Sequence, residues 1–305
     1  MAFNIDRFRE ERVYRCSGPL SELRADLDRL RLLDMAVEKS RREWGQAALL
    51  CLGAAVVAVA VRMTAEAGPE HAGLRQLSMG AAVLLLAGTV GTFVRYLRFR
   101  RLDLDNRRYT LASQVLHRLR QDIGARAPVK LVLDFTPVDG EEKLLGKRVT
   151  RSGWNVEDFS DPWFTLQTRL LDGTHLRIGM VQRLQKRSRT RRSSSGRYKT
   201  KHRKRSWAVI QVLLRVKPER HPDLALLEPE ARQAVKLPVG VSVARLQLDE
   251  DRMFLRTVVE GEWSAGQAVE TGSEVDAPRA VVMMLLSLFQ VLNYSKHLHK
   301  QAKAS

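Results

Sequence analysis

The chain has 305 residues and a formal net charge of +18 at neutral pH. Its two cysteines, Cys16 and Cys51, exclude a scaffold held together by several disulfides and agree with a reducing compartment. The excess of lysine and arginine predicts an anionic partner. The length allows one or two domains beside any membrane segment.

Two long apolar segments dominate the first third of the chain. Gln46–Val61 and Leu77–Val94 contain no charged residue, and Arg62 and Arg95 close them. A bilayer core requires about 20 predominantly apolar residues in a helix. We therefore interpret residues 46–97 as a transmembrane helical hairpin. The alternative is a pair of buried helices in a soluble protein.

Basic residues lie outside this hairpin on both sides. Arg41 and Arg42 precede the first segment, Arg98 and Arg100 follow the second, and the connecting loop has only Arg75. Because loops rich in lysine and arginine stay on the cytoplasmic side, both termini are predicted to be cytoplasmic. We expect an integral protein of a bacterial inner membrane.

Small residues recur within the two apolar segments. The predicted helix-packing positions are Ala54, Ala58, Ala87, Gly88 and Gly91. Small side chains let helix backbones approach closely, either within one hairpin or between copies of the chain. The pattern is compatible with a homo-oligomer or a larger membrane complex.

Amphipathic helices are predicted on either side of the hairpin. One apolar stripe runs along a helix within residues 1–45, and another runs along residues 98–127, where the helix is expected to continue from the second span. The stripes lie at matching distances from the hairpin turn, which favours a cytoplasmic coiled-coil stalk. The alternative is that both helices pack on the downstream domain. No structure is assigned to Met1–Cys16.

From residue 128 the apolar period changes to two, which predicts an antiparallel β domain over residues 128–305. The expected strands are Val129–Phe135, Leu145–Arg151, the arms of a hairpin over Trp163–Leu184, Trp207–Lys217, Val239–Leu248 and Met253–Glu260. The segment Gly153–Asp161 is expected to be loop. A helix over residues 277–295 is expected to cover the sheet. The fold class is therefore a membrane α+β protein.

The hairpin over Trp163–Leu184 contains the turn signal Asp172-Gly173. A two-residue turn would mix its apolar and polar faces. A three-residue turn over Asp172–Thr174 pairs Leu166 with Met180 and keeps the apolar residues on one face. The sequence therefore favours the three-residue turn.

The segment 183–205 has the most unusual composition in the chain, with 12 lysines and arginines and no acidic residue. The candidate anion-binding residues are Arg183, Lys186, Arg187, Arg189, Arg191, Arg192, Arg197, Lys199, Lys201, Arg203, Lys204 and Arg205. We interpret this basic arm as a ribbon or flexible arm that binds an anionic partner. The alternative is a solvated loop whose charge maintains solubility. Phospholipid headgroups are favoured because the domain is tethered to a membrane; nucleic acid and an acidic protein are the other candidates.

No catalytic, cofactor or metal motif has convincing spacing in the sequence. The acidic cluster Asp134, Asp139, Glu141 and Glu142 is typical of a solvated turn. The main hypothesis is a membrane-anchored scaffold or interaction protein without enzymatic activity, bound to the bilayer and to an anionic partner. The alternatives are a subunit of an oligomeric pore, transport or secretion assembly, and a membrane-tethered enzyme that uses the acidic cluster.

Overall fold

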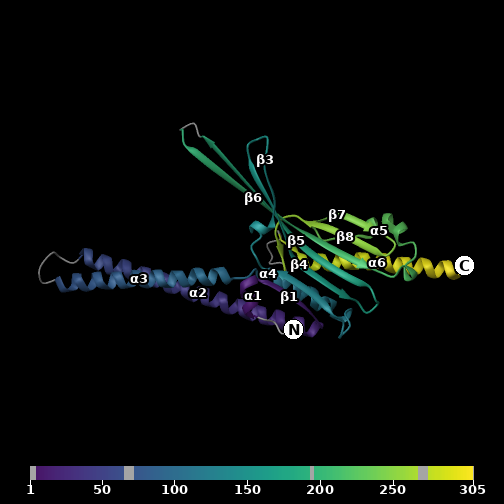
Figure 1. Cartoon of the computed structure of the whole chain (residues 1–305), viewed down its shortest axis with the longest axis horizontal. Coiled ribbons are helices and arrows are strands. Elements are labelled where there is room, and N and C mark those ends of the chain that lie inside the picture. Colours follow the sequence, from purple (N-terminus) through teal and green to yellow (C-terminus); the bar gives the residue numbers. More distant parts are fainter. Residues whose placement is uncertain (1–4, 65–71, 193–195, 267–273, 305) are drawn as a thin grey trace. The chain divides into compact units, whose positions relative to one another are not determined.

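The computed structural model describes residues 5–64, 72–192, 196–266 and 274–304. The chain divides into a helical unit, Asp28–Leu104, and a β unit that combines Met1–Leu27 with Asp105–Ser305. Helices and a mostly antiparallel sheet together confirm the α+β class (Figure 1).

The helical unit is built from two long helices, α2 (Leu20–Thr64) and α3 (Ala72–Leu102). They run antiparallel, since Gly45 lies against Tyr96, whereas Cys51, later on α2, lies near Gly88, which comes earlier on α3. The Arg95 guanidinium lies 4.8 Å from the centre of the Trp44 ring. The loop predicted between them falls largely outside the described residues. Among the described residues, three helices are long and apolar enough to cross a membrane. In α2 and α3 only 11% and 6% of the most apolar window is buried, against 56% in the C-terminal helix.

The contact between α2 and α3 follows a heptad pattern that the sequence interpretation missed. Buried or half-buried positions on α2 recur at alternating steps of four and three: Leu30, Asp34, Val37, Arg41, Trp44, Ala48, Cys51, Ala55 and Ala58. On α3 the matching positions are Ala82, Leu85, Thr89, Thr92, Tyr96 and Phe99. This spacing is typical of a left-handed coiled coil, and the small residues allow the helices to lie close together.

The predicted packing residues lie mostly off this seam. Ala58 is half-buried, whereas Ala54, Ala87, Gly88 and Gly91 are exposed within the hairpin. Their packing role and the homo-oligomer both stay predictions.

The end of the seam farthest from the connection between α2 and α3 contains polar residues. Asp34 is 2% exposed, and its Oδ1 accepts the Leu104 N–H at 3.2 Å. Arg41 forms an ion pair with Asp103. The prediction that one helix continues from the second span is wrong at this point, because α3 ends at Leu102. A new helix begins after Asp105, whose side chain accepts the Arg107 N–H at 3.2 Å as an N-cap.

The new helix, α4 (Asn106–Arg118), belongs to the β unit, so the predicted continuous stalk is also wrong. Its apolar stripe is buried in the β unit, with Leu111 and Val115 at most 1% exposed. This is the alternative in which an amphipathic helix covers the downstream domain. The reason is local, because the Asp105 cap starts a separate helix that is free to take its own direction.

Gly88 and Gly91 provide a direct test of the hairpin geometry. A Cβ built on Gly88 lies 3.9 Å from the Cys51 Sγ, whereas one built on Gly91 has no atom within 4 Å. In a Cys16→Ser background, we expect Gly88→Cys to form a disulfide with Cys51 on mild oxidation. Gly91→Cys is the control and should keep both thiols open to maleimide. Equal protection in the two variants would contradict the seam.

The β unit contains one sheet in the order β1-β2-β4-β5-β6-β8-β7, with β3 paired to β4, and a short parallel pair of β9 with β10. The strands of the large sheet are β1 (Val13–Gly18), β2 (Val129–Asp134), β3 (Leu144–Val149), β4 (Asn155–Arg169), β5 (His175–Arg192), β6 (Tyr198–Arg215), β7 (Val241–Leu248) and β8 (Arg252–Val259). The short strands are β9 (Trp263–Ser264) and β10 (Val275–Asp276), and the remaining helices are α1 (Ile5–Glu11), α5 (Glu228–Ala234) and α6 (Ala277–Ala304). Every pairing in the large sheet is antiparallel.

The hairpin of β4 and β5 has a three-residue turn, which confirms the predicted turn length. The turn lies one residue earlier than predicted, over Leu171–Gly173, because Leu170 pairs with Thr174. Leu166 consequently faces Ile178, not Met180. Gly173 has a φ of +90°, the backbone conformation that this turn requires and that glycine adopts without strain.

Two segments without a predicted strand belong to the sheet. Met1–Cys16 includes α1 and most of the edge strand β1, where Tyr14 is 3% exposed and its hydroxyl donates to Asp26 at 3.0 Å. The prediction of a loop over Gly153–Asp161 is wrong, because most of this segment forms the first half of β4. A bulge at Pro162, which has no N–H to donate, connects the two halves of this strand.

Helix α6 covers one face of the sheet, as predicted (Figure 1). Its inward residues include Met284 and Leu288, both fully buried. The helix is longer than expected, since it continues past residue 295 to Ala304.

Candidate functional site: the basic ribbon

The basic arm is an ordered antiparallel ribbon. Its described residues, 183–192 and 196–205, form the outer halves of β5 and β6 with their connection, and they project from the sheet (Figure 1). We call these residues the basic ribbon. Beyond the pair Ser188–His202, only β5 and β6 are paired with each other, because β4 ends its pairing at Asn155 opposite Ser188.

The register divides the ribbon into two unlike faces. Directly opposed residues share a face, and alternate residues along a strand share it as well. One face places Arg187 opposite Arg203, Arg189 opposite Lys201, Arg191 opposite Lys199 and Gln185 opposite Arg205. We call the seven cations of these pairs the cationic face.

The other face is mostly neutral, and we call it the polar face. It places Lys186 opposite Lys204, Ser188 opposite His202, Thr190 opposite Thr200 and Arg192 opposite Tyr198. The hydroxyls of Thr190 and Thr200 lie 3.0 Å apart. Of the remaining candidates, Arg183 lies opposite Trp207 at the root of the ribbon, one row inward from the cationic face and on the same side, and Arg197 lies just outside the paired strands. The structure therefore places eight of the 12 predicted residues on one side of the ribbon, seven of them in the cationic face.

Carboxylates neutralise the root of the ribbon but not its outer part. Lys186 pairs with Asp139 at 2.7 Å, and Arg148 of β3 pairs with Asp158. The hydrogen bond from Lys186 lowers the pKa of Asp139 below its ordinary value. In the described part of the chain, none of the seven cations of the cationic face forms an ion pair with a carboxylate. Like charges in direct opposition destabilise a strand pair. An anion that neutralises this surface therefore stabilises the ribbon.

Two tryptophans, which the sequence interpretation missed as part of the site, lie beneath these cations. The Arg203 guanidinium is 5.5 Å from the Trp154 ring centre, and that of Arg205 is 5.7 Å from the Trp207 ring centre. Both rings are half-buried. For the cations of this face, the signal in the sequence is parity: Arg187, Arg189 and Arg191 occupy odd positions, and so do Lys199, Lys201, Arg203 and Arg205 on the returning strand.

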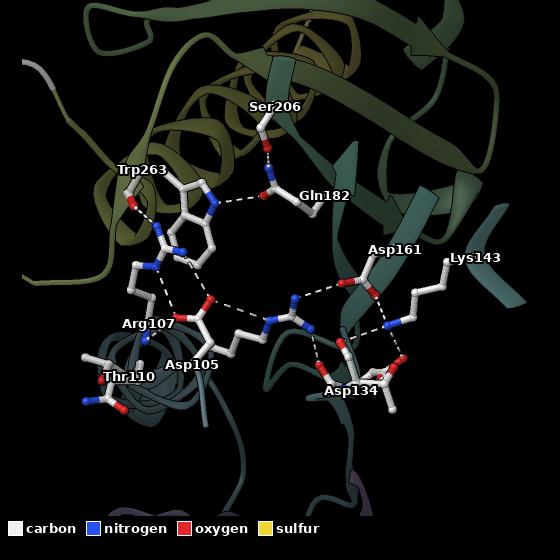
Figure 2. A network of polar contacts seen from close by, with 12 residues as sticks. Asp105, Arg107, Thr110, Asp134, Lys143, Asp161, Gln182, Ser206 and Trp263 are labelled. Carbon is white, nitrogen blue, oxygen red and sulfur yellow. Dashed lines mark hydrogen bonds and ion pairs between the residues drawn. The ribbon is translucent and has the colours of Figure 1, made fainter. Parts of the chain in front are cut away.

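A buried polar network supports the root of the ribbon (Figure 2). Asp161 lies at its centre, and its side chain is fully buried. The Asp161 carboxylate forms one ion pair with Arg108 at 2.8 Å and another with Lys143 at 2.8 Å. Lys143 also lies 3.0 Å from Asp134. Burial acts to raise the pKa of Asp134, but hydrogen bonds from the Thr136 hydroxyl and N–H, together with Lys143, lower it below its ordinary value.

The network continues through two stacked indoles. The rings of Trp163 and Trp263 lie 5.4 Å apart and nearly parallel. Trp263 donates to Gln182 at 3.0 Å, and Gln182 donates to Ser206 at 2.6 Å (Figure 2). Gln182 and Ser206 directly precede and follow the basic ribbon, so the network fixes the point from which the ribbon projects.

The outer end of the stack holds two arginines and one carboxylate. Arg107 lies 5.1 Å from the Trp263 ring centre, and Arg108 lies 5.3 Å from that of Trp163. Asp105 accepts from Arg107 at 3.1 Å and lies 3.8 Å from Arg108 (Figure 2). Every charge in this network has a partner of opposite sign, which is typical of a structural role.

The predicted acidic cluster is divided between different partners. Asp134 pairs with Lys143, and Asp139 pairs with Lys186. Over the described residues, no three histidine, cysteine or acidic side chains gather in a metal-binding arrangement. Comparisons with models of known protein families, with curated proteins and with solved structures give no significant match.

Proposed function

We propose that this chain is a membrane-anchored docking protein that holds an anionic partner against the cationic face of the basic ribbon. Helices α2 and α3 cross the membrane as a hairpin, and both termini lie in the cytoplasm. The exposed apolar side chains of the hairpin support this anchor, since Leu50 and Leu84 are 73% and 75% exposed in the chain alone. Exposed apolar surface of this extent is typical of contact with lipid.

The third apolar helix, α6, serves a different purpose in this proposal. More than half of its most apolar window is buried in the β unit, whereas α2 and α3 bury about a tenth or less. A helix already packed against protein has little apolar surface left for lipid. We therefore assign α6 to the core of the β unit and only α2 and α3 to the membrane.

The cationic face is the observation that carries the proposal. Six of its seven cations stand in opposed pairs, and among the described residues none of the seven has a compensating carboxylate. Acidic residues neutralise Lys186 and Arg148 near the root of the ribbon. A solvated loop that only maintained solubility would need neither an ordered register nor one charged and one neutral face. The arrangement supports binding by charge-assisted hydrogen bonds, for which arginine is well suited.

Two variants that remove the same charge test this proposal. The cationic-face variant replaces Arg191, Lys199 and Lys201 with glutamine, and the polar-face variant replaces Lys186, Arg192 and Lys204 with glutamine. Each removes one arginine and two lysines from the ribbon. The full chain, in nanodiscs of zwitterionic lipid, is eluted from immobilised heparin with rising salt. We expect the cationic-face variant to elute at clearly lower salt than the polar-face variant.

The comparison separates a docking surface from net charge. If net charge alone governed retention, both variants would shift equally. Equal shifts, or an earlier elution of the polar-face variant, would contradict the proposed function.

A further inference from the structure

We infer that the anionic partner is the sugar–phosphate backbone of a nucleic-acid duplex. This inference rests on the proposed function and adds the class of the partner. It is based on the shape of the cationic face, on the residues that border it and on the half-buried state of its two tryptophans.

The cationic face is long and narrow. Successive rows of cations along a strand are separated by two residues, or about 6.8 Å, and the two strands lie about 4.8 Å apart. The face contains three opposed cation pairs and a fourth row with Arg205. Its four rows therefore extend over roughly 20 Å. This elongated shape matches a linear polyanion better than a broad planar one.

The ribbon also has the dimensions of a duplex groove. The major groove of B-form DNA is about 12 Å wide and admits a two-stranded β-ribbon. Phosphates line both sides of the groove, at one negative charge per about 1.7 Å of helix axis. Beyond Ser188 and His202 the ribbon has only two strands, so no third strand widens the part that would enter.

A lipid surface fits these residues less well. Amphipathic segments that lie in a bilayer surface insert apolar or aromatic side chains beside their cations. On the cationic face, the rings of Trp154 and Trp207 are half-buried and lie against Arg203 and Arg205. The well-exposed Tyr198, at 76%, belongs to the polar face. Within the described ribbon, the cationic face has no open apolar side chain for insertion.

Single-stranded nucleic acid also fits less well. Proteins that bind single strands stack successive bases on aromatic rings. The two rings on the cationic face are half-buried and lie against Arg203 and Arg205, so they offer no open stacking surface for successive bases. A duplex requires only phosphate contacts for sequence-independent affinity, and the five arginines among the seven cations can each bind phosphate in a bidentate manner.

The test measures duplex binding by the full chain in nanodiscs of zwitterionic lipid. The probe is a fluorescent DNA duplex of mixed sequence and about three helical turns, followed by anisotropy over a salt series. If all seven cations contact phosphate, the logarithm of affinity falls with the logarithm of salt at a slope of about −6. The cationic-face variant should flatten the slope to about −3 or −4, since three contacts are lost. The polar-face variant should keep the slope of the original chain.

Vesicles containing phosphatidylglycerol and a single strand of the same sequence serve as competing probes. Binding of the duplex with the expected slope, lost selectively in the cationic-face variant, supports the inference. Capture of anionic vesicles that depends on the cationic face, without duplex binding, overturns the inference and leaves the proposed function intact. Stronger binding of the single strand than of the duplex also overturns it. Equal behaviour of the two variants toward heparin, duplex and vesicles refutes the proposed function itself.

Discussion

Replacing Asp161 with alanine is expected to lower the free energy of unfolding of the β unit by about 3–5 kcal/mol. The reason is the environment of its two partners. Arg108 and Lys143 each have a side chain only 6% exposed, and both lie 2.8 Å from the Asp161 carboxylate. Without that carboxylate, two cations remain buried with only the more peripheral Asp105 and Asp134 nearby. Thermal and urea unfolding in a mild detergent measures the loss.

The control for Asp161 is an exposed ion pair of the same sheet. Glu157 pairs with Lys147 at 2.9 Å, but the two side chains are 36% and 65% exposed. Glu157→Gln should therefore change stability by no more than about 1 kcal/mol. Near-ultraviolet circular dichroism adds a local readout, because the stacked Trp163 and Trp263 adjoin the buried arginine. Similar losses in the two variants would contradict the structural role of the network.

The second large effect concerns α6 and its assignment to the core. Leu288 is completely buried, whereas Leu286, two residues earlier on the same helix, is 59% exposed. Leu288→Ala should lower the free energy of unfolding by about 2–5 kcal/mol, since it removes a packed side chain and leaves a cavity. Leu286→Ala, which leaves no cavity, should change it by about 0.5 kcal/mol or less.

This pair of substitutions also distinguishes a core helix from a membrane span. A third span would place Leu286 against lipid or a neighbouring helix, and both leucines would then contribute to insertion. Comparable losses of stability in the two alanine variants would contradict the core assignment. So would a bilayer that protects the cysteine of Leu286→Cys from maleimide. Thermal unfolding and maleimide labelling of Leu286→Cys measure the two outcomes.

The elements that the sequence predicted well are those with strong local periodicity. The uncharged runs that form α2 and α3, the alternating strands on either side of Asp172-Gly173 and the apolar C-terminal helix each have a pattern that one structure explains. The three-residue turn followed from keeping Leu166 on the apolar face. Its exact position did not follow, because Leu171 is large and exposed and its pattern does not distinguish a strand end from a turn.

The elements that were missed depend on contacts between distant residues. β1 is short and has one buried residue, Tyr14, so its place in the sheet comes from pairing with β2 and not from its own pattern. The first half of β4 was obscured by Asp161-Pro162, a dipeptide that usually indicates a loop. Here it forms a bulge that directs Asp161 into the interior, toward Arg108 and Lys143. These two cations precede Asp161 by 53 and 18 residues, so no local sequence pattern predicts their contact with it.

The candidate site was predicted in composition but not in form. The charge of the basic arm was evident from the sequence, whereas its division into two faces required the register between Arg187 and Arg203. The sequence interpretation also favoured lipid headgroups, on the grounds of proximity to the membrane. The half-buried state of Trp154 and Trp207, on which the proposed duplex partner rests, depends on tertiary contacts.

The opposed cations have a consequence for how ionic conditions act on the ribbon. Added salt screens the repulsion between Arg189 and Lys201 and between Arg191 and Lys199, so the free ribbon becomes better ordered as ionic strength rises. The same salt competes with a polyanion for those side chains and weakens its binding. Ionic strength therefore has opposite effects on the rigidity of this surface and on its occupancy. Under the proposed function, the ribbon is therefore least ordered at the low ionic strength at which it attracts a polyanion most strongly, and bound polyanion supplies the neutralisation that orders it.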